Sequence, residues 1–232
     1  MYHAKHLALF SVVLLGCATG ISMMDDSNIP TIAREIAAAV SDESNHEPYA
    51  DLIRNELAAA GRAKSVVCSM PCFWSGEGHF GLQPGVIATT PGFLDGREVV
   101  EVIYDPNHTD LPLLLRKARH EGKANRVYCR DEETLRIARE IVGDDASLST
   151  AAIRPDDQPK WYLRQTGLRR LAMTPAQLTR INALLHARQP IEPYLSPTQR
   201  RLAKPLLGHD APEAPDLTTD TRLITAVREA SR

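Results

Sequence analysis

The order of strand and helix patterns between residues 63 and 143 limits the possible folds of this chain more than any other feature. An apolar run over 63–69 predicts a central strand. Side chains that alternate between two faces over 98–104 predict another strand. The order strand–helix–strand–strand–helix–strand is typical of the ferredoxin-like split βαβ sandwich, so we expect an α/β (α+β) fold. The predicted elements are 63–69, 77–82, 86–90, 98–104, 111–121, 126–129 and a further helix at 132–142, with a turn at 91–96.

Helical segments are expected on both sides of this core domain. Residues 17–62 contain a polar tether and then two N-terminal helices within 29–61, whose apolar faces we expect to pack against the sheet. A lid over a pocket is the alternative role for them. The boundaries predicted are therefore 17–62 for this part and 63–143 for the core domain.

Residues 144–232 form the third part, which resembles no family that we can name. A polar, proline-bearing linker up to residue 159 leads to Lys160-Trp161-Tyr162. A helical appendage follows, with helix starts at Thr174-Pro175 and Ser196-Pro197, and then a flexible tail. We expect the appendage to dock on the sheet, with contact to a partner protein as the alternative.

The first 16 residues predict a secretory signal peptide. A weakly basic start precedes a short apolar run, Leu7 to Leu15, which is too short to span a bilayer. The run ends in Leu14-Leu15-Gly16-Cys17, which resembles a bacterial lipobox, with Cys17 as the lipidated residue. This predicts an exported protein held by lipid on the periplasmic side of the cell envelope. An ordinary signal peptide with an incidental Cys17 is the alternative.

Composition excludes some functions. The formal net charge of −2 gives no electrostatic reason to expect nucleic-acid binding. Four cysteines are too few for a disulfide scaffold, and no Cys/His cluster has the spacing of a closed zinc site. A metal site built from Cys68, Cys72 and His79 is a minor alternative. We expect no metal and no cofactor.

The stretch from Met70 to Phe80 carries the strongest chemical signal. Cys72 is predicted to lie at the turn between a strand and a helix N-terminus, where the helix dipole favours a thiolate. Phe73 and Trp74 can form an apolar wall beside the sulfur, and Glu77 is close enough to deliver a proton.

This stretch resembles the active-site signature of the A-type peptide methionine sulfoxide reductases, Gly-Cys-Phe-Trp-Gly-x-Glu. Cys72, Phe73, Trp74 and Glu77 match it in type and spacing, whereas Pro71 and Ser75 replace its two glycines. Two later segments, 82–86 and 98–106, resemble the family's Leu-Pro-Gly-Val and Glu-Val-Val-x-Val-x-Tyr-Asp-Pro segments.

The resemblance implies an oxidoreductase that repairs oxidised methionine, in proteins or as a small molecule. Cys72 would attack the sulfoxide sulfur and become a sulfenic acid, Glu77 would protonate the oxygen, and Phe73 and Trp74 would hold the methyl group. A second thiol, for which Cys129 is slightly favoured over Cys68, would form a disulfide with Cys72. An external thiol reductant, such as a thioredoxin-like protein, would then reopen it.

Several residues depart from the family pattern and keep other functions open. Phe93 stands where the family has a tyrosine, and the family's His-Asp-Pro-Thr and Asp-x-Gly-x-Gln-Tyr-Arg-Ser runs are absent. Much of the expected oxygen-binding shell is therefore missing. A second hypothesis is another envelope thiol-redox protein, acting in disulfide exchange or peroxide sensing. A third is a non-catalytic binding module on the same fold.

Overall fold

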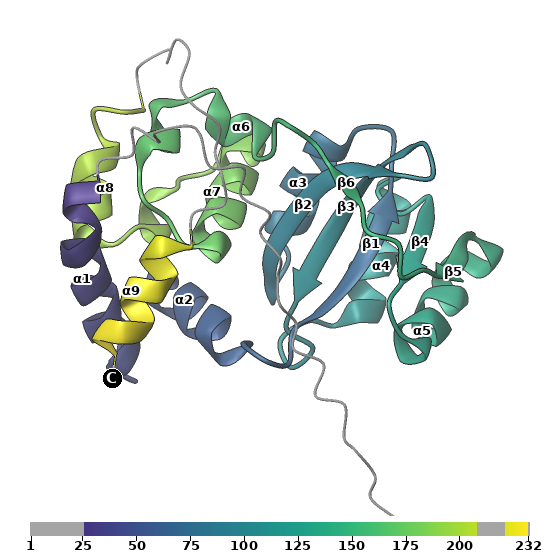
Figure 1. Ribbon diagram of the computed structural model, residues 1–232, viewed down its shortest axis with the longest axis horizontal. Coiled ribbons are helices and arrows are strands. Elements are labelled where there is room, and N and C mark those ends of the chain that lie inside the picture. Colours follow the sequence, from purple (N-terminus) through teal and green to yellow (C-terminus); the bar gives the residue numbers. More distant parts are fainter. Residues whose placement is uncertain (1–25, 208–220, 232) are drawn as a thin grey trace, which may run out of the picture.

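A computed structural model describes residues 26–207 and 221–231, and it contains two parts that lie side by side (Figure 1). One part is a mixed sheet with three helices, and the other consists of helices from both ends of the chain. The helices are α1 (Ile29–Ser41), α2 (Pro48–Ala58), α3 (Phe73–Gly81), α4 (Leu111–His120), α5 (Glu132–Val142), α6 (Trp161–Arg164), α7 (Pro175–Ala187), α8 (Pro197–Ala203) and α9 (Arg222–Ala230).

The sheet confirms the ferredoxin-like topology. Its strand order is β5-β4-β1-β3-β2-β6, and the inner four strands are antiparallel. The order β4-β1-β3-β2, with α3 after β1 and α4 after β3, is that of the split βαβ sandwich. The strands are β1 (Lys64–Ser69), β2 (Val86–Leu94), β3 (Arg97–Tyr104), β4 (Arg126–Cys129), β5 (Ala146–Leu148) and β6 (Arg154–Pro155).

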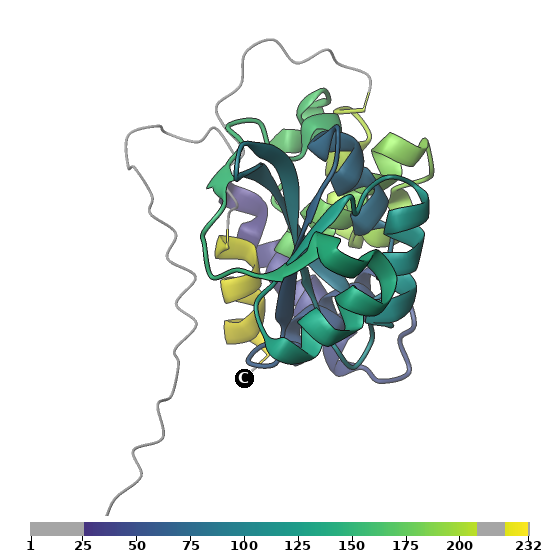
Figure 2. The ribbon, with the colours of Figure 1, turned by 90° about the vertical axis from the view of Figure 1, so that its right-hand side faces the viewer.

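Three helices cover one face of the sheet. Side chains that alternate along β1 and β3, among them Val66, Cys68 and Val100, pack with α3, α4 and α5 in the largest apolar cluster. Figure 2, turned by 90°, places α5 and the β5 edge nearest the viewer. Val66, Cys68 and Val100 are fully buried. The clean alternation in the sequence therefore corresponds to one face packed against helices.

A strap, residues 149–153, covers the opposite face. The chain pairs as β5 in parallel with β4 at one edge of the sheet, and then as β6 antiparallel with β2 at the other edge. Between the two edges Ile153 packs on Val67, Leu94, Val99 and Tyr128. The segment 144–159, predicted as a polar linker, is thus part of the sheet and carries the chain to its far edge (Figure 1).

The hairpin between β2 and β3 also differs from the prediction. The turn was expected at 91–96, but β2 continues through Pro91 to Leu94. The turn itself is formed by Asp95 and Gly96, which both have positive φ angles, 51° and 72°. An Asp-Gly pair with this backbone matches the right-handed twist of a hairpin.

The N-terminal helices pack with the C-terminal segment rather than against the sheet. Apolar residues of α1 and α2, such as Ile32, Ile36 and Ile53, share one cluster with Leu223 and Val227 of α9. The expectation of packing on the sheet was wrong for these helices. Within the described ranges, no helix is long and apolar enough to cross a membrane. The predicted signal peptide and Cys17 lie outside the described residues.

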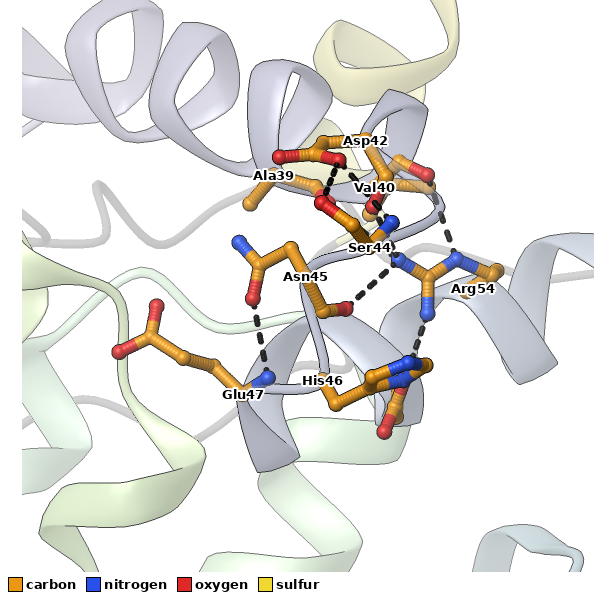
Figure 3. A network of polar contacts seen from close by, with 9 residues as sticks. Ala39, Val40, Asp42, Ser44, Asn45, His46, Glu47 and Arg54 are labelled. Atoms are coloured by element: carbon orange, nitrogen blue, oxygen red, sulfur yellow. Dashed lines mark hydrogen bonds and ion pairs between the residues drawn. The ribbon is translucent and has the colours of Figure 1, made fainter.

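Arg54 fixes the connection between α1 and α2 (Figure 3). A cation at a helix C-terminus is favoured by the helix dipole and by unpaired carbonyls. The Arg54 guanidinium also pairs with Asp51, one turn earlier on α2. It donates hydrogen bonds of 3.1–3.3 Å to four backbone carbonyls, those of Ala39, Val40, Asp42 and Asn45.

The C-terminal helices begin in two linked capping boxes. The side chains of Thr174 and Ser196 accept hydrogen bonds from the backbone N–H groups of Gln177 and Gln199, respectively. The side chain of each glutamine accepts a hydrogen bond from the backbone N–H of its cap residue in return. The two glutamine amides also bond to each other, at 2.8 and 3.0 Å, while fully buried. A paired set of buried amides leaves few unsatisfied polar groups, so it fixes how α7 and α8 meet.

Glu56 is a buried carboxyl group inside the helical part. Its Oε1 accepts from the backbone N–H of Ala176, whereas Oε2 has no hydrogen-bond partner. Burial raises the pKa of Glu56 to about 7, and hydrogen bonds from Thr174 and Ala176 oppose this only in part. The folded protein therefore binds a proton that the unfolded chain releases at lower pH.

We predict that Glu56→Gln stabilises the protein in a pH-dependent way. Since the folded pKa is raised, the free energy of unfolding of the wild type falls as pH rises from about 4.5 to 7. The neutral glutamine removes this loss, which is on the order of 3 kcal/mol above pH 7 and vanishes below pH 4.5. Urea unfolding at pH 4.5, 6 and 8 measures it, and a difference independent of pH would contradict the argument.

Candidate active site

Cys72 lies at the N-terminus of α3, as the sequence predicts. It is the N-cap residue, with extended backbone angles (φ −145°, ψ 107°), between the end of β1 and Phe73. The helix begins one turn earlier than expected, at Phe73 instead of Glu77. The Cys72 thiol is free and exposed, whereas Cys68 and Cys129 are buried. Cys72 is thus placed for reaction with a molecule from solution.

Glu98 is a neighbour of Cys72 that sequence reasoning missed. The Cys72 side chain makes no capping bond, and the Glu98 carboxylate of β3 accepts instead from the Phe73 backbone N–H at 2.9 Å. A carboxylate at a helix N-terminus is favoured by the unpaired N–H groups. It also places a negative charge beside the position where a thiolate would form.

Glu77 lies one turn and a half into α3 and is fully buried. All its contacts are with donors. Oε1 accepts from the Thr89 hydroxyl at 3.1 Å and from the Lys160 ammonium at 2.6 Å, and Oε2 accepts from the Lys160 backbone N–H at 2.8 Å. One residue from the C-terminal segment therefore holds both oxygens of the predicted acid.

The Glu77–Lys160 ion pair is shielded from water. The side chains are 0% and 11% exposed. The Lys160 ammonium also donates to the Thr89 carbonyl and hydroxyl oxygens, so its three protons have three acceptors. Removing one partner of a buried pair costs about 3–5 kcal/mol, because the other charge stays buried.

The aromatic residues form a stack rather than an open pocket. The Trp74 ring lies parallel to that of Trp161, with centroids 4.0 Å apart, and its N–H donates to Asp156. Phe73 is buried and packs edge-on against Phe93, at 5.3 Å. Of the predicted substrate wall, Trp74 is therefore partly accessible and Phe73 belongs mainly to the core.

Tyr162 lies near both chemical groups of the site. Burial raises the pKa of Tyr162, and the charges of Cys72 and Glu77 raise it further. These electrostatic interactions place its hydroxyl within the field of the thiol and the carboxylate. The His186 ring of α7 contacts the Tyr162 ring, at 4.5 Å between centroids. A tyrosine is thus present at the site although Phe93 has no hydroxyl.

Cys129 does not meet Cys72. It pairs across the sheet with Val66, three residues before the end of β1, while Cys72 lies three residues beyond that end. About 10 Å of strand separates Val66 from Ser69 alone, and a disulfide needs Cα atoms within about 7 Å. Burial also raises the pKa of Cys129 to about 11. In this register Cys129 lies too far from Cys72 for the disulfide that the sequence slightly favoured.

Cys68 offers no better second thiol. It is fully buried between β3 and β4, in register with Val100 and Val127, and burial raises its pKa. Its position fits a small apolar core residue. Among residues 26–207 and 221–231, no group of three or more His, Cys, Asp or Glu side chains could hold a metal ion.

Three of the residues that sequence reasoning missed share one origin. Lys160, Trp161 and Tyr162 follow the strap and approach α3 from the far edge of the sheet (Figure 1). A lysine beside two aromatic residues was the only local signal, and it suggested contact with a partner protein. In the structure the partner is the chain's own Cys72 region.

Comparisons with known proteins agree with the resemblance to the methionine sulfoxide reductases. No protein-family model matches the chain. It is 29% identical over 113 residues to the peptide methionine sulfoxide reductase MsrA of Mycolicibacterium vanbaalenii, covering 36% of this chain and 67% of that protein. It is 31% identical over 101 residues to MsrA of Mycobacterium ulcerans, covering 32% of this chain and 59% of that protein. It is 30% identical over 105 residues to MsrA of Nocardia farcinica, covering 33% of this chain and 62% of that protein.

The chain therefore contains a divergent domain similar to the A-type peptide methionine sulfoxide reductases. It spans about three fifths to two thirds of the length of these relatives. Among solved structures, methionine sulfoxide reductase A of Corynebacterium diphtheriae shares 22% identity over 35% of this chain and 55% of that one, with a TM-score of 0.32. The ferredoxin-like core is established by the strand order of the chain itself.

We predict that Glu98→Gln increases the rate at which Cys72 reacts with iodoacetamide at pH 7, by about two- to tenfold. The substitution removes a negative charge next to the thiol but keeps an acceptor for the Phe73 N–H, so the thiolate is less opposed. Glu101→Gln is the matched control, because Glu101 lies on the same strand and contacts Ser65 and Arg130 instead. Equal rates in both variants and the wild type would contradict the assigned effect of Glu98.

Proposed function

We propose that this protein reduces the S-sulfoxide of methionine, free or in peptides, to methionine by thiol chemistry at Cys72. The observation that carries the proposal is the exposed Cys72 at the start of α3, with the buried Glu77 on the same helix. At the family level, the similarity to three methionine sulfoxide reductases supports this reaction class.

The reaction balances with one cysteine and one proton. The Cys72 thiolate attacks the sulfoxide sulfur while a proton is delivered to the oxygen from the side of Glu77. The sulfur–oxygen bond of the substrate breaks, the oxygen ends on Cys72 as a sulfenic acid, and the thioether leaves. The substrate sulfur is reduced by two electrons and Cys72 is oxidised by two. The methyl group would rest against the exposed part of the Trp74–Trp161 stack.

An external thiol completes the cycle in this proposal. Because Cys68 and Cys129 are buried in the sheet, neither is placed to attack a sulfenic acid on Cys72. A small thiol or a thioredoxin-like protein would attack it directly, which forms a mixed disulfide and releases water. A second thiol would then release Cys72 with formation of a disulfide of the reductant. The approach is open, since Cys72 is exposed.

The first experiment measures turnover of a methionine S-sulfoxide with dithiothreitol, using the fragment from Ser27 onward. We expect no turnover in Cys72→Ser and a loss of about 10²–10³ in Glu77→Gln, because a positioned acid contributes this much. Cys129→Ser should keep turnover within about twofold of the wild type, as no internal second thiol takes part.

Four outcomes would point elsewhere. Turnover that survives in Cys72→Ser would refute the assigned nucleophile, and loss of turnover in a folded Cys129→Ser would restore the internal disulfide. Absence of turnover in the wild type, with rapid alkylation of Cys72, would favour disulfide exchange or peroxide sensing. A Cys72 that reacts no faster than a free thiol would favour a binding module.

We also propose that the protein is exported and anchored by lipid at Cys17, as the lipobox-like sequence suggests. Lipid chains contribute roughly 0.8 kcal/mol per buried CH₂, so several chains hold a protein firmly on a membrane. The full chain is then expected in the membrane fraction, and Cys17→Ser in the soluble fraction. Equal distribution of both forms after fractionation would refute the anchor.

A further inference from the structure

We propose that Lys160 supplies the proton that Glu77 passes to the sulfoxide oxygen, so that the two residues act as one buried proton-delivering pair. The inference rests on the proposed function and deepens it. Lys160 acts through Glu77 and does not itself need to touch the substrate. It lies on the segment that approaches α3 from the C-terminal part of the chain.

The hydrogen bonds show why Glu77 needs a proton source. A carboxylic acid donates one bond, but both Glu77 oxygens here only accept, from Thr89 and from two groups of Lys160. Both oxygens therefore act as acceptors, as in a carboxylate that faces an ammonium group. The ammonium lies 2.6 Å from Oε1, which is a distance for direct proton transfer.

Burial lowers the free-energy cost of this transfer at the moment of reaction. The two side chains are almost completely shielded from water, and a proton that moves from Lys160 to Glu77 turns two buried charges into two neutral groups. Desolvation favours neutral groups, so the acid form of Glu77 becomes accessible without a proton from solvent. After the oxygen takes this proton, the neutral amine of Lys160 recovers one from water.

The backbone of Lys160 supports a specific role. Its φ and ψ angles, 57° and 47°, lie in the left-handed region, which residues other than glycine rarely adopt. This conformation turns the backbone N–H towards Oε2 while the side chain reaches Oε1. Residues held in such conformations concentrate at functional sites.

Other titratable groups come from the elements around the pair. Cys72 caps α3, and Tyr162 of α6 interacts electrostatically with Cys72 and Glu77. From α7, His186 contacts the Tyr162 ring, and from the strap end Asp156 bonds the indole of Trp74. The strand beside the pair, β2, contributes only the uncharged Thr89.

The test uses Lys160→Gly. Glycine adopts the left-handed conformation readily and keeps the backbone N–H for Glu77, so the substitution removes the side chain with its ammonium group and retains this backbone contact. We expect kcat at pH 8 to fall by about 10- to 100-fold with KM within twofold. The alkaline limb of the pH–rate profile should move to lower pH by at least one unit, because a carboxyl group alone loses its proton earlier than an ammonium group.

Chemical rescue separates proton supply from a structural role. Ethylamine or n-butylamine should restore at least part of kcat to Lys160→Gly, with the rate depending on the amine's own acidity. Lys160→Arg should stay slow, because a guanidinium keeps the charge but does not release a proton in proteins. Lys64→Met is the control, since Lys64 forms a Lys–Glu pair of the same 2.6 Å length with Glu133, exposed and remote from α3.

Each outcome is decisive. Lys160→Gly with kcat within twofold of the wild type, or Lys160→Arg with full activity, would overturn the proton supply while leaving the reductase proposal intact. A lost activity that amines do not restore, with an unchanged pH profile in a folded variant, would reduce Lys160 to a structural ion pair. Absence of turnover in the wild type would overturn the proposed function, and this role with it.

Discussion

The buried ion pair between Glu77 and Lys160 joins two segments that lie 83 residues apart in the chain. Neither group can be buried alone without a large loss of solvation, so the C-terminal segment has to be in place for α3 to keep its carboxylate inside. Trp161 stacks on Trp74 and Tyr162 lies in the field of Cys72, so the same contact brings three consecutive side chains to the candidate site. The site is therefore built from both parts of the molecule.

The strap explains how this becomes possible. A ferredoxin-like sheet has one face covered by helices, and apolar residues on its other face, as here, also have to be shielded from water. Here the chain crosses that face from β5 to β6, buries Val67 and Val99 under Ile153, and arrives at the edge of β2 next to α3. The segment that completes the core thus also delivers Lys160 to Glu77. Helix α7 then packs on α3, where Gly81 allows close approach to Thr179.

The core topology and the position of Cys72 could be predicted because they depend on local patterns. Alternating apolar residues mark β3, and a cysteine before a helix start marks the N-cap. The course of β2 could not be predicted, since a Pro-Gly pair usually ends a strand. Pro91 is tolerated because its backbone faces the two-residue β6, where its carbonyl accepts from Asp156 and no donor is required of it.

The helical part and half of the site were missed for a different reason. Helix α1 packs with α9, and Lys160 pairs with Glu77. Both contacts join distant segments of the chain, which no local periodicity specifies. Lysine side chains are usually exposed, so Lys160 suggested a surface role in the sequence. Glu98 was likewise read as one face of an alternating strand, although the register places its carboxylate at the start of α3.

The most direct test of this account is a single turnover without reductant. The wild-type fragment is mixed with excess methionine S-sulfoxide, methionine is quantified, and sulfenic acid is trapped with dimedone and located by mass spectrometry. The account predicts about one equivalent of methionine per chain, with dimedone on Cys72 and on no other cysteine, since one thiol accepts one oxygen. Formation of no methionine while Cys72 remains unmodified, or dimedone on Cys68 or Cys129, would contradict it.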